Sequence, residues 1–229
     1  TPKPSSAASD VYKRQVVLSH FHSDHTGGLI KLRQVYKELN ADAFSEVYVA
    51  RGFFDQRYYK DGSMEGPGNY KDSSKFKKAA EEEGISFIIL DDYKKISNNL
   101  YATGTVERVV EKYNGPKGFY LDKDLTIPDI IRDDQSVGML TDNGWIMMSG
   151  CGHSGIINTA MKLQSIKNEP VYGAIGGFHL FKASDNTIST TANWLKDNGL
   201  TKFMGGHCTG IYAACLLYTS PSPRDLSTS

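Results

Sequence analysis

The prediction of the fold starts from residues 16–29, which read V-V-L-S-H-F-H-S-D-H-T-G-G-L. An apolar run leads directly into His20, His22, Asp24 and His25, which lie within six residues of one another. Neutral imidazole and carboxylate are the ligands that zinc prefers outside thiolates, so this cluster favours a divalent metal site. A chance group of surface histidines is the alternative, and the strand–turn–helix context weighs against it.

The spacing also predicts how the cluster is arranged. Residues 16–19 read as a short buried strand. Side chains alternate along extended backbone, so His20 and His22 should share one side and one metal. Asp24 and His25 follow one turn later, before a glycine pair, and can point in another direction, towards a second metal.

The composition is that of an ordinary globular chain. With 229 residues, 39% of them hydrophobic and 23% charged, it is long enough for one large domain or two small ones. Lys+Arg and Asp+Glu are 26 each, which argues against a strongly basic nucleic-acid surface. No apolar run is long enough to span a membrane. The three cysteines, Cys151, Cys208 and Cys215, do not suggest a disulfide framework and fit a reducing, cytoplasmic compartment.

Both ends of the chain look foreign. Residues 1–15 and 215–229 are rich in Ser and Pro, lack periodicity, and resemble translated adapter sequence at the ends of metagenomic reading frames. We therefore predict that the native protein runs from about Val16 to about Ala214. Ordinary disordered termini are the alternative. The native N-terminus would then be missing, so the lack of a signal peptide carries no weight.

Periodicity predicts an alternation of strands and helices. Helices are predicted over 27–39, 73–83, 156–167 and 187–197, and strands over 46–50, 85–90, 171–175 and 202–204. Residues 100–110 should be extended with a break at Thr103-Gly104-Thr105, and Asp142-Asn143-Gly144 should close a hairpin between 136–141 and 145–149. Residues 51–72 should form a long aromatic loop that either packs over the core or lines a pocket for a planar substrate.

All six histidines lie in or beside a turn after a predicted strand. Besides the first cluster, these are His153, His179 and His207. The sequence thus predicts an α/β fold whose polar residues converge at the strand ends, where open α/β sheets place their sites.

Five stretches together resemble the metallo-β-lactamase-fold superfamily. They are V-V-L-S-H-F-H-S-D-H-T-G-G-L, I-I-R-D-D-Q-S (130–136), S-G-C-G-H-S-G-I-I-N-T (149–159), A-I-G-G-F-H-L (174–180) and G-H-C-T-G (206–210). The set is most similar to the branch of 7,8-dihydropterin-6-methyl-4-(β-D-ribofuranosyl)aminobenzene-5'-phosphate synthase-like proteins of methanopterin biosynthesis, which includes metal-dependent hydrolases. The resemblance implies a partial αββα sandwich over 16–214. The strands that precede H-x-H-x-D-H in the superfamily would be missing here.

The resemblance also implies how two metals are held. One metal would take His20, His22 and His153, and the other would take Asp24, His25 and His207.

The ligand that completes the site stays open. Cys151 stands where the superfamily usually has a bridging Asp, so either the Cys151 thiolate or His153 serves. His179 is a further ligand or a residue that contacts the substrate. Cys208 is expected only to pack in its turn.

The implied activity is that of a metal-dependent hydrolase or a dihydropterin-type synthase. Two divalent ions, with zinc favoured and iron or manganese as alternatives, would activate a hydroxide or hold a leaving pyrophosphate. Asp24 and His179 are the predicted catalytic residues, and Asp24 would orient the hydroxide. The expected partner is a small-molecule substrate that is phosphorylated or pterin-like. No association with a membrane is expected. A catalytically silent metal-binding regulator is one alternative. A nucleic-acid-processing enzyme of the same fold is another, and the zero net charge disfavours it.

Overall fold

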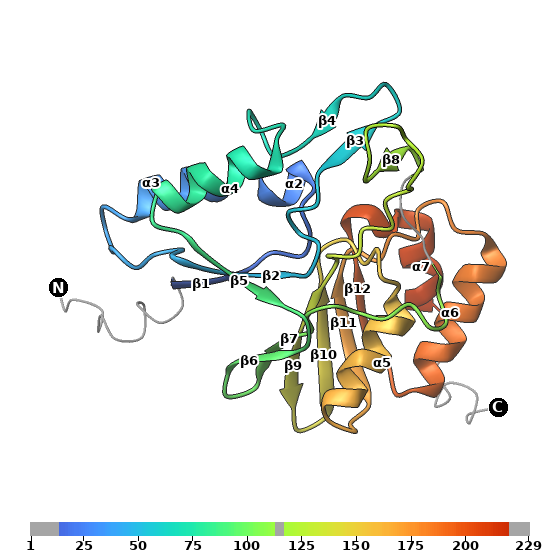
Figure 1. Ribbon diagram of the computed structural model, residues 1–229. Coiled ribbons are helices and arrows are strands. Elements are labelled where there is room, and N and C mark those ends of the chain that lie inside the picture. Colours follow the sequence, from blue (N-terminus) through green and yellow to red (C-terminus); the bar gives the residue numbers. More distant parts are fainter. Residues whose placement is uncertain (1–13, 113–116, 220–229) are drawn as a thin grey trace, which may run out of the picture. The chain divides into compact units, whose positions relative to one another are not determined.

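Figure 1 shows the computed structural model of the chain, which describes residues 14–112 and 117–219. Among these residues two compact units are distinct. Unit 1 comprises 14–90 and 117–129, and unit 2 comprises 91–112 and 130–219. Of the predicted foreign tails, 1–13 and 220–229 lie outside the described residues, whereas Gln15 and residues 215–219 belong to regular elements. The single domain expected over 16–214 stays a prediction.

Unit 1 is built on a parallel three-stranded sheet in the order β1-β2-β5. The strands are β1 (Gln15–Val17), β2 (Glu46–Ala50) and β5 (Ser86–Leu90), and the helices are α2 (Ser23–Thr26), α3 (Leu29–Tyr36) and α4 (Ser73–Glu82). Parallel neighbours need crossover connections, which α2 with α3 and then α4 provide. Phe21 is fully buried in the core of this unit, among Phe53 and Phe76. Burial of Phe21 therefore fixes the segment that carries His20 and His22 to the core of unit 1.

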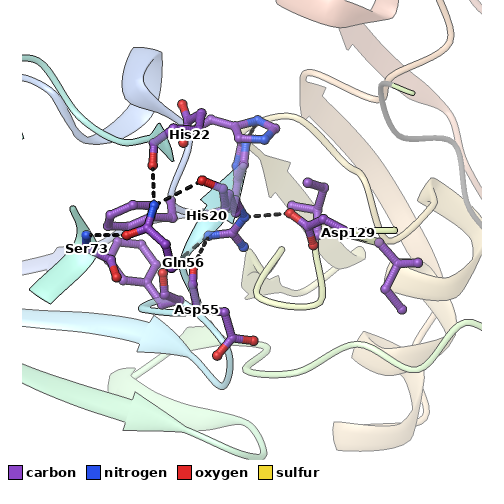
Figure 2. Close-up of polar contacts among 12 residues, drawn as sticks. His20, His22, Asp55, Gln56, Ser73 and Asp129 are labelled. Carbon is purple, nitrogen blue, oxygen red and sulfur yellow. Dashed lines mark hydrogen bonds and ion pairs between the residues drawn. The ribbon is translucent and has the colours of Figure 1, made fainter. Parts of the chain in front are cut away.

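A second sheet of unit 1, in the order β4-β3-β8, is antiparallel. Its strands are β3 (Arg57–Tyr59), β4 (Met64–Glu65) and β8 (Phe119–Tyr120). The Gln56 side chain bonds to β3 and β4 of this sheet and also to Ser73 at the start of α4, the contact that Figure 2 labels. The Gln56 amide nitrogen lies 3.0–3.2 Å from the backbone carbonyls of Arg57, Glu65 and Lys71, and its oxygen accepts the N–H of Ser73 at 2.9 Å. These strands were not predicted because two or three residues are too few to show a period.

Unit 2 contains a six-stranded sheet in the order β12-β11-β10-β9-β7-β6. Its strands are β6 (Lys94–Ser97), β7 (Leu100–Ala102), β9 (Ser136–Thr141), β10 (Gly144–Ser149), β11 (Val171–Gly176) and β12 (Lys202–Gly205). β10, β11 and β12 are parallel, and the other neighbours are antiparallel. Ser149 pairs with Gly176, and Gly176 pairs with Gly205. The three parallel strands therefore end level with one another.

The helices of unit 2 are α5 (Ile156–Ile166), α6 (Asp185–Asp197), the 3-10 helix η1 (His207–Thr209) and α7 (Ile211–Thr219). Trp145 and Met147 of β10 are fully buried among residues of α5, α6 and α7, whereas Ile146 and Met148 between them are not. This alternation shows that the sheet buries one face against these helices. In the part of the chain that the structure describes, no helix is long and apolar enough to cross a membrane.

Most predicted elements are confirmed to within two residues: the helices at 73–83, 156–167 and 187–197, and the strands at 46–50, 85–90, 136–141, 145–149, 171–175 and 202–204. The bounds of the helix expected over 27–39 were wrong, because the Gly27-Gly28 pair separates α2 from α3 and the helix ends at Tyr36. The break predicted at Thr103-Gly104-Thr105 is confirmed, since β7 ends at Ala102 and Gly104 takes a φ of 60°. The extended stretch expected to continue to Val110 was wrong, because residues 105–110 form no strand. Helix α7 and strand β6 were not predicted.

Candidate metal centre

In unit 1, the residues that follow β1 fold three imidazole rings onto one another. The Leu18 N–H still bonds to the Tyr48 carbonyl at 3.1 Å, and the chain then leaves the sheet. The His22 carbonyl accepts the N–H groups of His25 and Thr26 and also the Thr26 hydroxyl. These three bonds start α2 and return the chain towards the end of β1.

The imidazole rings of this cluster are in contact. His20 is fully buried, and its Nε2 lies 2.9 Å from Nδ1 of His22. The His25 ring centroid is 4.4 Å from that of His20, and His25 Nε2 is 3.4 Å from Oδ2 of Asp24. His20 and His22 therefore lie side by side, in line with their spacing. The His25 ring also contacts the His20 ring, and the expectation that Asp24 and His25 serve a second metal stays a prediction.

Ser19 contacts the rings of both His20 and His25 through their Nδ1 atoms. Its hydroxyl oxygen lies 3.0 Å from Nδ1 of His20 and 3.2 Å from Nδ1 of His25. A hydroxyl has two acceptor lone pairs, so Ser19 can accept an N–H from both rings and leave Nε2 of each as a lone pair. This is the arrangement by which outer partners orient metal-binding histidines. Sequence analysis missed this role, although a serine directly before His20 was a visible signal.

The charge state of His22 is set by its surroundings in unit 1. Burial, and then the Arg57 guanidinium, lower the pKa of His22 from 6.5 to about 4. Arg57 is itself fully buried and its Nε donates to Oδ2 of Asp129 at 2.6 Å. His22 is therefore neutral near pH 7, the form of imidazole that binds metal.

In unit 2, the other predicted site residues follow the three parallel strands. Cys151 and His153 come after β10, His179 after β11 and His207 after β12. Because the strands end level, their carboxyl ends bring these turns to one edge of the sheet. The convergence predicted at strand ends is therefore observed within unit 2.

These turns bring sulfur and nitrogen atoms close together. Sγ of Cys151 lies 3.7 Å from Nδ1 of His179 and 3.0 Å from Sγ of Cys208. The His153 and His179 ring centroids are 4.4 Å apart, and His153 is buried. The ligand atoms of Cys151, His153 and His179 lie within 4.8 Å of one another, and so do those of Cys151, His207 and Cys208.

Cys208 is the residue that sequence analysis undervalued, since only turn packing was expected of it. Its sulfur lies against Cys151 and accepts the His179 N–H at 3.3 Å. The hydrogen bond with Cys151, and then that with His179, lower the pKa of the Cys208 thiol from 9.0 to about 5. Its only sequence signal was its place directly after His207.

Asp134 supports the turn that carries His153. It is fully buried, and its Oδ2 accepts the Ser154 N–H at 2.9 Å while the Ser154 hydroxyl donates to its carbonyl at 3.0 Å. Burial raises the pKa of Asp134 from 3.8 to about 6. The Asn158 amide also donates to the Ser154 carbonyl at 2.7 Å. Sequence analysis noted R-D-D-Q-S as a motif but assigned it no role.

Both groups of side chains suit a metal ion by their chemistry. Imidazoles with a carboxylate suit zinc, iron or manganese, and the thiols of unit 2 add soft ligands. The expected pairings of His20 and His22 with His153, and of Asp24 and His25 with His207, draw on both units and stay predictions.

Comparison with known proteins gives related sequences and related solved structures. No protein-family model matches the chain. It is 30% identical over 205 residues to 7,8-dihydropterin-6-methyl-4-(β-D-ribofuranosyl)-aminobenzene-5'-phosphate synthase of Methanocaldococcus jannaschii, covering 86% of this chain and 67% of the relative. It is 31% identical over 206 residues to an uncharacterized protein of the same organism, covering 86% and 70%.

One related crystal structure is that of Tm1679, a metal-dependent hydrolase of the β-lactamase superfamily. The TM-score is 0.70 at 24% identity, covering 89% of this chain and 72% of Tm1679. At this identity the likeness concerns the fold alone, and it agrees with the predicted α/β class.

Proposed function

Since this chain belongs to the metallo-β-lactamase superfamily, we propose that it is a metal-dependent enzyme acting on a phosphorylated, pterin-like small molecule. The observation that carries the proposal is the donor set of unit 1. His20 and His22 face each other through ring nitrogens 2.9 Å apart, with His25 and Asp24 alongside. Such a set of imidazoles and carboxylate is typical of a divalent metal site.

Two divalent ions are proposed, zinc being favoured, with iron or manganese as alternatives. The proposed ligands are His20, His22, Asp24 and His25 of unit 1 and Cys151, His153 and His207 of unit 2. Their division between two ions rests on the sequence motifs alone. When bound, such ions supply Lewis acidity towards phosphate oxygens or a water molecule.

The protein's own groups would prepare this chemistry. The Ser19 hydroxyl would accept the Nδ1–H of His20 and of His25. The Nε2 lone pairs of both rings would then be available to the metal. Asp24 is exposed and would accept a hydrogen bond from the attacking nucleophile. His179, whose ring contacts those of His153 and Phe181, would contact the substrate.

An aromatic pair beside His22 would bind the planar part of the substrate. The Phe119 ring lies 5.2 Å from that of His22 and 5.0 Å from that of Tyr59, and both aromatic residues are half-buried. Offset stacking on such rings suits a flat bicyclic ligand. Phe53, which belongs with Tyr59 to the aromatic stretch 51–72, is buried and packs in the core of unit 1.

A synthase reaction is preferred to hydrolysis because the related synthase is 30% identical, whereas the likeness to the hydrolase concerns the fold alone. In this reaction an aminobenzene carbon or nitrogen nucleophile attacks the methyl carbon of a dihydropterin methyl diphosphate. The bond from that carbon to oxygen breaks, pyrophosphate leaves, and the nucleophile gives up a proton. Asp24 is the proposed acceptor of that proton.

The test combines metal content with turnover. The protein would be loaded with zinc, iron or manganese and mixed with the dihydropterin methyl diphosphate and the ribofuranosyl-aminobenzene 5'-phosphate, and pyrophosphate release would be followed. We expect turnover that His20→Ala abolishes together with metal binding and that the exposed-site variant Ser86→Ala retains. Tight metal binding with no turnover on these compounds or on phosphoesters would refute the proposal and favour the silent metal-binding regulator.

A further inference from the structure

Two thiols of unit 2 lie in contact although neither is part of a disulfide. Cys151 follows β10 and Cys208 lies in η1 after β12, and their sulfur atoms are 3.0 Å apart. The chain's third cysteine, Cys215, lies in α7 and is exposed. Cys151 and Cys208 are separated by 57 positions in the sequence, so their contact is a product of the fold.

The strand β11 lies between the strands that precede Cys151 and Cys208, and the residues at its end leave room for the two sulfur atoms to meet. β11 separates β10 from β12, and its end continues into Gly176-Gly177. A Cβ on Gly177 would lie 2.3 Å from the Gly150 carbonyl oxygen and 3.0 Å from Sγ of Cys208. Only glycine at position 177 therefore leaves room for the turn that carries Cys151 and the turn that carries Cys208 to come into contact.

We propose that Cys151 and Cys208 form a reversible disulfide when the protein meets a peroxide. A disulfide bond is about 2.05 Å long, so the sulfur atoms need to approach by only about 1 Å. Cys208 lies in a three-residue 3-10 helix between Gly206 and Gly210, and these glycines give the backbone the freedom for that movement.

The positions of the two sulfurs assign the order of the steps. Cys208 is half-buried, so its sulfur is the more accessible of the two. Cys151 is 5% exposed. Cys208 is therefore the thiol that meets the oxidant, and Cys151 is the thiol that resolves the product.

The chemistry balances with hydrogen peroxide as the oxidant. The Cys208 sulfur attacks one peroxide oxygen, an S–O bond forms, the O–O bond breaks, and the departing hydroxide takes the Cys208 thiol proton to become water. The Cys151 sulfur then attacks the Cys208 sulfenic acid, an S–S bond forms, the S–O bond breaks, and the leaving hydroxide takes the Cys151 proton. Two thiols and one peroxide thus give one disulfide and two waters.

Oxidation would have a consequence for the metal centre, and this part rests on the proposed function. A disulfide sulfur is not a thiolate ligand, so the oxidised protein loses Cys151 as a donor. Metal bound through Cys151 should in turn slow the oxidation.

The test is thiol counting and mass spectrometry on the reduced, metal-free protein treated with one equivalent of hydrogen peroxide. We expect two thiols to disappear, the mass to fall by that of two hydrogens, and a Cys151–Cys208 crosslinked peptide that dithiothreitol removes. Cys215→Ser, the matched control, should behave as wild type. Cys208→Ser and Cys151→Ser should form no intramolecular disulfide, and in Cys151→Ser the Cys208 thiol should instead gain oxygen.

Oxygen addition without a crosslink in the wild-type protein would overturn the proposal, and so would a disulfide that involves Cys215. A crosslink that forms equally fast in guanidinium-unfolded protein would also overturn it, because the fold would then contribute nothing. The same measurement with zinc present separates the two proposals. If the disulfide forms and zinc does not slow it, Cys151 is not a metal ligand, whereas the oxidation site stands.

Discussion

Replacing Ser19 by alanine should weaken metal binding although no proposed ligand is removed. The Ser19 hydroxyl lies 3.0 Å from Nδ1 of His20 and 3.2 Å from Nδ1 of His25. Without it, both rings lose the contact that orients them, and the Nδ1 tautomer that leaves Nε2 as a lone pair is no longer favoured. The variant therefore separates the orientation of the ligands from their presence.

The size of the effect follows from the two contacts. A hydrogen bond of this kind contributes about 1 kcal/mol net, so the loss of two amounts to roughly 2 kcal/mol. Since about 1.4 kcal/mol corresponds to a tenfold change in affinity, we expect zinc to bind about 30-fold more weakly. This lies within the roughly 10- to 100-fold loss that accompanies removal of a histidine's outer partner.

The assay is competition for zinc against a chromogenic chelator, with the fold checked by circular dichroism. Ser19→Thr keeps a hydroxyl and should bind zinc almost as wild type does. Ser86→Ala removes an exposed hydroxyl from β5 and should change nothing. Unchanged zinc affinity in folded Ser19→Ala would refute the assignment of Ser19 as the residue that orients the rings.

Other predictions concern the stability of the metal-free protein, measured by urea unfolding. Stability should fall as pH decreases from 6.5 to about 4, because the unfolded chain takes up the proton that buried His22 does not. The loss is at most about 3 kcal/mol, at about 1.4 kcal/mol for each tenfold change in proton affinity, and His22→Gln should not show it. Asp134 should act in the opposite sense: its pKa is raised from 3.8 to about 6, so stability falls as pH rises through that window, and Asp134→Asn should remove this slope. Arg57→Met removes the guanidinium that pairs with buried Asp129 and should cost about 3–5 kcal/mol, most of which Arg57→Met combined with Asp129→Leu should restore. A single variant as stable as wild type would contradict this account of the buried pair.

The first cluster was predictable from sequence because its geometry is local. His20, His22 and His25 lie within six positions, and a strand end followed by a turn is enough to bring them together. The contact of His25 with Ser19 and with the His20 ring was not predicted, because it depends on the first turn of α2, which a spacing argument does not include.

The contacts that sequence did not predict are those set by register. Arg57 reaches Asp129 across 72 positions and Cys151 reaches Cys208 across 57. Neither pair has a periodic signal, because each depends on where neighbouring strands end relative to one another. Sequence could place Cys151 and Cys208 in separate strand-end turns, but only the level ends of β10, β11 and β12 bring them into contact.

The backbone of unit 2 shows where these turns are under strain and why. His179 and His207 have φ values of 46° and 48°, in the left-handed region that residues with a Cβ avoid at a cost of about 1–3 kcal/mol each. Glycine occupies the positive-φ positions beside them, at Gly176 and Gly210, where it costs nothing. Glycine would remove the strain at 179 and 207 as well, but it would also remove the imidazole. The sequence thus keeps a strained side chain at the two left-handed positions that can offer a ring nitrogen at the strand ends. Phe44, Leu125 and Ile131 also take positive φ, so the conformation alone does not single out the two histidines. What supports a chemical role for His179 and His207 is that each follows a parallel strand and offers its ring nitrogen within 4.8 Å of the Cys151 sulfur.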